Sequence, residues 1–321
     1  MASDEAALAG RTPEGWSTEA ERRYADAQAR LAEHCGVDVA SRTVDTESAG
    51  RIHFLEAGDP DGEPVVFLHG VSTTAATWLP MLSALADDYR LVVPDRPGRG
   101  LSNSAKYTNK HLRSFMTAYL ADLFDELGLD SPHVVGNSLG GQQAFLLALD
   151  HQRVDRLCLV GAPGGVSKEF SALWKLMTVR GVNRVLYWLN SLGDAEENAR
   201  ESTAELLVAD DSAVPEPFYD VLAAASGMDA QQWSLRSLQT AQGSFGRMHD
   251  LFDLTDELPG IERPTCFVWG TEDSFWKPEV GRPVADSMPD AAFHELDGYG
   301  HMPWLDPGDE TEERVRAFLD G

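Results

Sequence analysis

Positive charge is scarce in this chain. Only five of its 321 residues are lysines, and its 26 lysines and arginines face 52 aspartates and glutamates, which gives a formal net charge of −26 at pH 7. A surface of that sign repels the phosphate backbone. We therefore expect no nucleic-acid partner.

The same numbers are similar to those of proteins from salt-loving organisms, in which acids cover the surface and arginine is favoured over lysine. In molar salt the Debye length falls to about 3 Å, so the repulsion between like charges is screened. An acidic protein of an ordinary cytoplasm is the other interpretation. A salt-adapted protein and an ordinary acidic one therefore both remain open.

Long apolar runs are missing as well. No run approaches the length that crosses a bilayer, and residues 1–5 have neither the positive start nor the apolar core of a signal peptide. We expect a cytoplasmic protein without a membrane partner.

Cysteine pairs and cofactor motifs are also lacking. Cys35, Cys158 and Cys266 cannot all pair with one another, and two of them lie in apolar, strand-like runs. No glycine-rich loop has phosphate-binding or dinucleotide spacing, and no histidine and carboxylate cluster has metal spacing. We expect no disulfide framework, no metal and no cofactor.

The most informative feature that is present is the stretch 136–141, Gly-Asn-Ser-Leu-Gly-Gly. It follows a short apolar run and precedes a segment of helical composition. The Gly-x-Ser-x-Gly pattern predicts a sharp turn between a strand and a helix, with Ser138 at the turn as a nucleophile. Glycine suits the flanking positions because a side chain there would collide with the neighbouring strand or helix.

Strand-like and helix-like segments alternate through most of the chain. We expect an N-terminal helix over 18–34 and then an antiparallel hairpin of 37–46 and 51–57. The alternation that follows predicts a mainly parallel α/β sheet flanked by helices. The expected strands are 64–69, 90–94, 132–137, 154–160, 264–270 and 291–296, and the expected helices are 75–86, 108–128, 139–150, 279–287 and 309–319.

The alternation stops between residues 164 and 258. Four helical stretches are expected there, at 170–189, 196–208, 216–225 and 231–242, with no convincing strand. The chain therefore divides into an N-terminal helical extension (1–36), an α/β core (37–163 and 259–321) and a helical insertion (164–258). The N-terminal helix packs on the body in this scheme, and a homo-oligomer formed through it is compatible with the sequence.

Five motifs occur in an order that resembles the α/β-hydrolase family. They are His69-Gly70, the turn 95–100 (Asp-Arg-Pro-Gly-Arg-Gly), the Ser138 turn, the loop with Asp273 and the loop 298–304 with His301. The resemblance runs from about residue 50 to the C-terminus. It implies the α/β-hydrolase fold, with the insertion 164–258 as a helical cap.

The resemblance also implies catalytic roles. A serine hydroxyl needs a base to attack, and histidine, with an unperturbed pKa of about 6.5, suits that task. The family places this base at His301, and the acid that orients it at Asp273, with Glu272 as the nearest competitor. We interpret His294 as a strand residue and His69 as structural, and we expect the remaining histidines to be solvated.

The oxyanion of the tetrahedral intermediate needs preformed donors. By resemblance these are the backbone N–H groups of Val71 and Leu139. Arg96 and Arg99 are interpreted as ordering their own turn.

Aromatic and amide side chains near these motifs are candidates for the substrate pocket. Core packing is the simpler interpretation of Trp174 and Trp188, which lie in an apolar helix. The better candidates are Trp276 and Phe275, because they follow Asp273 in a loop. The pocket candidates are Trp78, Asn137, Phe275, Trp276 and Trp304.

A serine at the turn favours acyl transfer over the alkyl-ester chemistry of aspartate enzymes with this fold. The favoured function is a carboxylesterase for small or medium, apolar esters or lactones. The alternative is a carbon–carbon bond hydrolase of the meta-cleavage-product type, in which Trp304 and Arg180 or Arg184 would contact the substrate. A non-catalytic ligand receptor is a third possibility, and an intact Ser-His-Asp set argues against it.

Overall fold

The computed structural model describes residues 15–245 and 247–321, so the first fourteen residues of the predicted extension lie outside the described part. An eight-stranded sheet forms the centre of the molecule, in the order β1-β2-β4-β3-β5-β6-β9-β10. β1 pairs antiparallel with β2 and β2 antiparallel with β4, while the other neighbours are parallel. The strands are β1 (Val39–Thr46), β2 (Gly50–Gly58), β3 (Glu63–Leu68), β4 (Tyr89–Pro94), β5 (His133–Gly136), β6 (Leu157–Val160), β9 (Thr265–Gly270) and β10 (Ala291–Leu296).

Helices cover both faces of this sheet. One buried apolar cluster joins the sheet to α1, α2, α8 and α11, and a second joins it to α3, α4, α9 and α10. The predicted mainly parallel α/β sheet flanked by helices is therefore confirmed. The α-helices are α1 (Glu19–Cys35), α2 (Leu79–Leu82), α3 (Leu112–Leu127), α4 (Leu139–Leu146), α5 (Ala172–Met177), α6 (Val182–Asn190), α7 (Ala195–Leu206), α8 (Glu216–Ser226), α9 (Asp229–Gln242), α10 (Pro278–Ser287) and α11 (Glu310–Leu319).

Two predicted helices are wrong in their extent. The stretch 75–86 forms a 3-10 turn, η1 (Ala75–Trp78), and the single turn α2, because Pro80 has no N–H to continue a helical ladder. The stretch 170–189 is split into α5, which ends at Met177, and α6, which begins after Gly181, whose φ of +91° is not helical. The segment 164–258 also contains a two-stranded ribbon, β7 (Gly243–Ser244) with β8 (Arg247–Met248), where no strand was expected.

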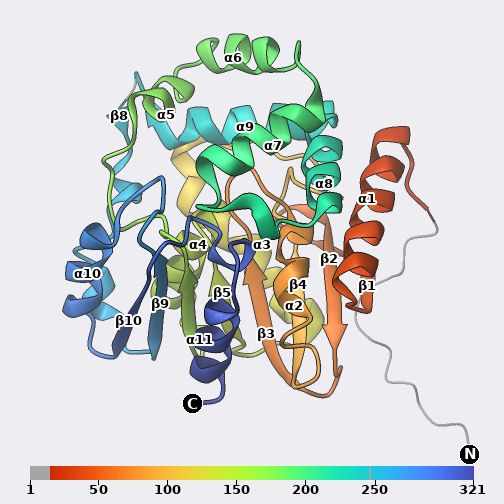
Figure 1. Cartoon of the computed structure of the whole chain (residues 1–321). Helices are drawn as coiled ribbons and strands as arrows, with labels where there is room; N and C mark the ends of the chain where they lie inside the picture. The colour runs from red at the N-terminus through yellow and green to blue at the C-terminus, as the bar shows by residue number, and fades with distance from the viewer. Residues whose placement is uncertain (1–14, 246) are drawn as a thin grey trace, which may run out of the picture.

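Helix α1 begins and ends with clear signals. Thr18 and Glu21 form a capping box, and Gly36 closes the helix in the left-handed conformation. Tyr24 and Leu31 on its apolar face are fully buried in the cluster that includes α8. Figure 1 shows α1 standing beside α8 at one edge of the molecule. The helix thus uses its apolar face within the chain.

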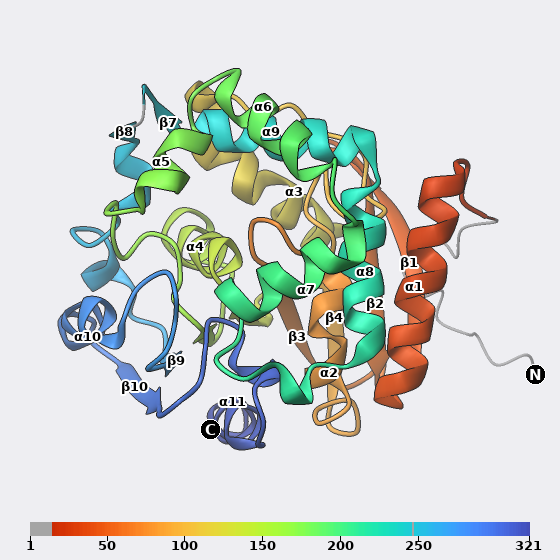
Figure 2. The same cartoon turned by 45° about the horizontal axis from the view of Figure 1, so that its top comes forward.

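The five helices between β6 and β9 lie over one edge of the sheet (Figure 1). Viewed from that side, α5 to α9 form an arc above the turn where α4 begins (Figure 2). Parallel strands end at the same edge, so β5 and β9 deliver their following loops beneath these helices. Within the described part of the chain, no helix is long and apolar enough to cross a membrane.

Candidate active site

The backbone at Ser138 makes the turn that the sequence predicts. Ser138 has φ 54° and ψ −118°, a conformation that L-residues rarely adopt, between the end of β5 and the first residue of α4. A Cβ on Gly136 would come within 2.8 Å of the Gly140 backbone, and a Cβ on Gly140 would overlap the Leu68 carbonyl of β3. The two glycines therefore let strand and helix approach closely enough to hold Ser138 at the tip.

Asp273 and His301 lie side by side. The Asp273 Oδ2 atom is 2.7 Å from His301 Nδ1 and also accepts a hydrogen bond from the Ala162 N–H at 2.9 Å. Its Oδ1 atom accepts from the N–H of Phe275 at 2.9 Å. Both side chains are buried, with 1% and 3% of their surface exposed. Donors on both oxygens fix the carboxylate, which in turn orients the imidazole.

Glu272, the competing acid, points elsewhere. Its carboxylate is largely exposed and pairs with Lys277 at 3.0 Å. The geometry therefore favours Asp273 as the partner of His301.

Asn137 ties the loops of the site together. Its Nδ2 donates to the carbonyl of Val160 at 2.8 Å and to the carbonyl of His301 at 3.0 Å. This buried amide therefore fixes the backbone that carries His301 to the ends of β5 and β6. Although Asn137 borders the cavity, as expected for a pocket residue, its amide group is used for holding the loop.

Two arginines hold the loop 69–73, which faces the Ser138 turn. Arg96 donates to the carbonyls of Gly70 and Val71, and Arg99 donates to the carbonyls of Ser72 and Thr73. The interpretation that both order only their own turn is therefore wrong. With these carbonyls bound, the loop has a defined course where Val71 lies on the cavity wall.

His69 belongs to the same network. Its Nε2 accepts the N–H of Arg96 at 3.0 Å, and its Nδ1 donates to the Gly70 carbonyl at 2.8 Å. Burial, and then the charge of Arg96, lowers the pKa of His69 to about 3. A neutral imidazole is what these two bonds require, in agreement with the predicted structural role.

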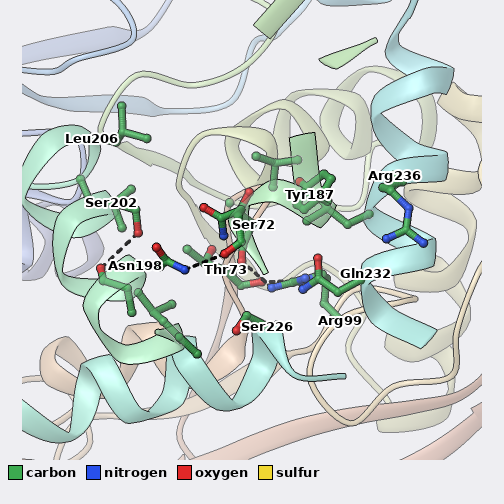
Figure 3. Close-up of a pocket in the computed structure, with 18 of the residues that line it drawn as sticks. Ser72, Thr73, Arg99, Tyr187, Asn198, Ser202, Leu206, Ser226, Gln232 and Arg236 are labelled. Atoms are coloured by element: carbon green, nitrogen blue, oxygen red, sulfur yellow. Dashed lines mark hydrogen bonds between the residues drawn. The ribbon is translucent and has the colours of Figure 1, made fainter. Parts of the chain in front are cut away.

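A cavity of about 630 Å³ opens above Ser138. Ser138, His301 and Phe275 line its floor together with Val71, and the Phe275 ring lies 4.3 Å from the His301 ring. Side chains of α5 to α9 line most of the rest, with Ser72, Thr73 and Arg99 from the core (Figure 3). Leu139 is the first residue of α4, so its N–H has no hydrogen-bond partner inside the helix. This N–H can therefore donate to a group bound next to Ser138.

Three tryptophans expected at the pocket lie elsewhere. The stacked rings of Trp78 and Trp304, 4.1 Å apart, are buried, and the indole N–H of Trp304 donates to the Thr77 carbonyl. Trp276 is also buried and donates to the Glu169 carbonyl. None of these three is among the described residues that line the cavity. Their apolar rings are used for packing instead.

Conversely, two tryptophans expected in the core border the cavity. Trp174 of α5 and Trp188 of α6 both line it, and 59% of Trp188 is exposed. The apolar stripe of these helices faces the cavity and solvent because α5 and α6 lie far above the sheet. Helical periodicity predicts an apolar face but not what that face meets.

The expectation that the remaining histidines are solvated is wrong for two of them. His53 is fully buried, with its Nδ1 2.6 Å from Asp95 Oδ2 and its Nε2 2.9 Å from Ser41 Oγ. His133 is also buried, between the carboxylates of Glu63 and Asp155. Neither lines the cavity.

The cluster of Glu63, His133 and Asp155 is the one group in the described residues with the spread of a metal site. Glu63 faces Nε2 of the ring and Asp155 faces Nδ1, at 3.1 and 3.4 Å. Carboxylates that face opposite nitrogens of the ring are also suited to pair with the imidazole itself. The absence of a metal site stays a prediction.

Comparison with known proteins agrees with this architecture. The model of the alpha/beta hydrolase family matches residues 65–314, most of the chain. The chain belongs to this family. A 2-hydroxy-6-oxo-6-phenylhexa-2,4-dienoate hydrolase from Burkholderia cepacia is 27% identical to this hydrolase over 287 residues, which cover 84% of this chain and 91% of the relative.

Solved structures of two kinds share its fold. Carboxylesterase CesB from Bacillus subtilis aligns with a TM-score of 0.73 at 20% identity, covering 94% of this hydrolase and 99% of the esterase. A 2-hydroxy-6-oxo-6-phenylhexa-2,4-dienoate hydrolase from Rhodococcus sp. strain RHA1 aligns with a TM-score of 0.74 at 20% identity, covering 89% and 100%. At this identity both show the fold alone.

Proposed function

We propose that this hydrolase is a carboxylesterase that works through an acyl-enzyme on Ser138. The observation that carries the proposal is the 2.7 Å contact of the buried Asp273 with His301, which lines the same cavity as the strained Ser138 turn. His301 takes the Ser138 proton during attack and returns it to the leaving alcohol. Asp273 keeps the imidazole in the tautomer that leaves Nε2 free and stabilises the imidazolium.

The N–H groups of Val71 and Leu139 form the oxyanion hole in this proposal. Both residues border the Ser138 turn, one on the loop held by Arg96 and the other at the start of α4. The start of a helix also carries partial positive charge, which favours an oxyanion there. One such donor is worth about 10²- to 10³-fold in rate.

The segment 164–258 acts as the cap of this site. Its helices supply most of the cavity wall, so their side chains decide which esters fit. A cap also limits water near the acyl-enzyme.

The carbon–carbon hydrolase remains the second candidate, because curated relatives at 27% to 29% identity have that activity. Arg184 lines the cavity, as that function would require, but Arg180 does not line it. Trp304 is occupied in its stack with Trp78. These placements favour the esterase, whose reaction needs Ser138, His301, Asp273 and the oxyanion donors but neither Trp304 nor a cap arginine.

Labelling with a fluorophosphonate tests the nucleophile. The probe should modify the wild type at one residue, and Ser138→Ala should lose both labelling and hydrolysis of 4-nitrophenyl butyrate while keeping its melting temperature. Ser83→Ala, which removes an exposed hydroxyl outside the cavity, is the control and should label normally. Full labelling of Ser138→Ala would contradict the proposal.

A substrate comparison separates the two candidate reactions. The esterase assignment predicts that kcat/KM for simple 4-nitrophenyl esters exceeds that for a 2-hydroxy-6-oxo-dienoate. The opposite order, with the same dependence on Ser138, would assign the carbon–carbon hydrolase.

A further inference from the structure

Basic residues gather around the cavity of this otherwise acidic protein. Arg99, Arg184 and Arg236 line it, and Asp229 is the one carboxylate among the described residues of the lining. In the whole chain acids outnumber basic residues two to one. The cavity therefore has the opposite charge balance to the rest of the molecule.

A groove next to the cavity continues this pattern. It runs between the loop 106–109 and helices α6 and α9, and its charged residues are Lys106, Arg180, Arg184 and Arg236. No carboxylate is among the described residues that line it. Arg184 and Arg236 line both the groove and the cavity, so the two share a wall.

These cations are not neutralised by partners. Several arginines elsewhere in the described part of the chain form ion pairs with carboxylates, such as Arg113 with Asp150. Within the described part of the chain, neither Arg99 nor any of the four groove cations forms an ion pair with a carboxylate. What distinguishes the site is that five such cations gather along one cavity and groove, where Asp229 is the one carboxylate among the described lining residues.

Arg99 is the innermost of these cations. It is 3% exposed, and its Nε and Nη2 atoms donate to the carbonyls of Thr73 and Ser72. Its Nη1 atom is buried and has no hydrogen-bond partner. Figure 3 shows its guanidinium between this loop and Gln232 of α9. Burial, and then the charge of Arg96, lowers the pKa of Arg99 to about 10, so it stays a cation at neutral pH.

Burying a guanidinium costs free energy when it donates only to neutral carbonyls and one of its nitrogens has no hydrogen-bond partner. A bound negative group would offset that cost. The free nitrogen has two N–H bonds, and Arg99 is among the residues that line the cavity in which a substrate would lie. A carboxylate there would make a charge-assisted hydrogen bond in a region with little water. The acidic exterior would repel such an anion, whereas the groove offers it a path of opposite charge.

We propose that the cavity accepts esters that carry a carboxylate, that Arg99 binds this carboxylate, and that the groove of Lys106, Arg180, Arg184 and Arg236 guides it inward. This inference rests on the proposed ester hydrolysis at Ser138 and names its substrate class. It replaces the expected purely apolar ester by one with an apolar part and an anionic end.

Matched pairs of esters test the inference. Mono-4-nitrophenyl glutarate and 4-nitrophenyl pentanoate differ in a terminal carboxylate on the acyl side, and 4-acetoxybenzoate and its methyl ester differ on the alcohol side. In at least one pair the wild type should prefer the acid by about 10- to 100-fold in kcat/KM, the range of one charged hydrogen bond. Equal or lower kcat/KM for the acid in both pairs would overturn the inference.

The Arg99→Gln variant isolates the anion site from the loop that Arg99 also holds. Damage to the loop would slow both members of a pair alike, so the acid-to-neutral ratio is the readout, and it should fall to about 1. Arg263→Gln makes the same charge change at an exposed residue outside the cavity and should keep the wild-type ratio. An Arg99→Gln variant that keeps the wild-type acid-to-neutral ratio would overturn the assignment of the carboxylate site. If Arg99→Gln does not fold, Arg236→Gln takes its place, and a wild-type ratio in that variant would overturn the assignment.

The groove has its own signature. Potassium chloride should lower kcat/KM for the acid but not for the neutral ester, and Lys106→Gln with Arg180→Gln should weaken that salt dependence. Salt dependence that is the same for both esters would overturn the guiding role.

A binding measurement separates this inference from the proposed reaction. Ser138→Ala protein is titrated by calorimetry with monomethyl glutarate, dimethyl glutarate and inorganic phosphate. Binding of the monoester alone, lost in Ser138→Ala/Arg99→Gln, would support the carboxylate site even if no ester is hydrolysed. Equal binding of the two glutarates, or tighter binding of phosphate, would overturn it, even if Ser138 proves to be the nucleophile.

Discussion

At the scale of single residues, Asp273 offers the sharpest test of the site. Asp273→Asn puts an amide among groups that all donate, including Ala162 N–H and His301 Nδ1–H. Either the amide nitrogen clashes with a donor, or the imidazole turns to the tautomer that cannot act as a base. We expect kcat to fall by roughly 10³- to 10⁴-fold, as such a change does in serine proteases.

Stopped-flow measurement of the acylation burst on 4-nitrophenyl butyrate checks this prediction. Glu272→Gln is the matched control, because its exposed carboxylate pairs only with Lys277, and it should acylate at the wild-type rate. A slow Glu272→Gln beside a fast Asp273→Asn would reassign the acid.

The residues of the site differ in how far the sequence could predict them. Ser138, Asp273 and His301 follow local patterns at strand ends, and the fold brings the last two together as predicted. Arg96 and Arg99 carry no such local signal for their contacts, because their partners lie some 25 residues earlier in another loop. Which tryptophans face the cavity depends likewise on how the helices dock.

At the scale of elements, the strands were the easiest to predict. Each parallel strand is a short apolar run with turn residues on both sides, so β3, β4, β5, β9 and β10 lie within a few residues of their expected bounds. The segment 164–258 was harder. Its helical composition is local, whereas the end of α5 at Met177 and the new start of α6 after the non-helical Gly181 are not visible in that composition.

Helix α1 should contribute to stability through its buried face. Leu31 is fully buried in the cluster with α8, so Leu31→Ala removes packing and leaves a cavity. We expect a loss of about 2 to 5 kcal/mol in the free energy of unfolding, measured by urea denaturation. Exposed Glu33→Ala should change it by less than about 0.5 kcal/mol. Similar values for the two variants would mean that α1 is not anchored on α8.

Helix α11 contains a carboxyl group whose environment opposes its charge. Burial, and then the neighbouring Asp309, raises the pKa of Glu312 to about 7 from an ordinary 4.5. At pH values between these two pKa values, the folded protein binds more protons at this site than the unfolded chain. The site therefore lowers the free energy of unfolding as pH rises from about 4.5 to about 7.

Glu312→Gln removes this penalty. The variant should gain about 1 to 2 kcal/mol over the wild type at pH 8 and little at pH 4, as measured by urea midpoints at both pH values. The control variant Glu313→Gln, which changes the exposed neighbouring residue, should show no such difference in stability between the two pH values. A gain for Glu312→Gln that is equal at pH 4 and pH 8 would contradict the protonation argument.

At the scale of the whole molecule, charge is distributed unevenly. The net charge of −26 was evident from composition, but the sequence could not reveal that Arg99, Arg184 and Arg236 meet at one cavity. They lie on a core loop and on two helices of the segment 164–258, and only the docking of α6 and α9 over the sheet joins them. Salt should therefore relieve repulsion on the acidic exterior, whereas at the cavity it should weaken the attraction for an anion.

The stability of the fold should therefore rise with salt, because most of its surface charge is of one sign. At 0.1 M salt like charges interact over about 10 Å, whereas at 1 M the range is about 3 Å, so screening relieves repulsion in the compact state. We expect the melting temperature to rise between 0.1 and 2 M potassium chloride. The variant Asp26→Asn/Asp87→Asn/Asp256→Asn removes three exposed charges and should melt higher at low salt with a smaller rise. A flat melting temperature in the wild type, or equal slopes in both proteins, would favour an ordinary acidic hydrolase over a salt-adapted one.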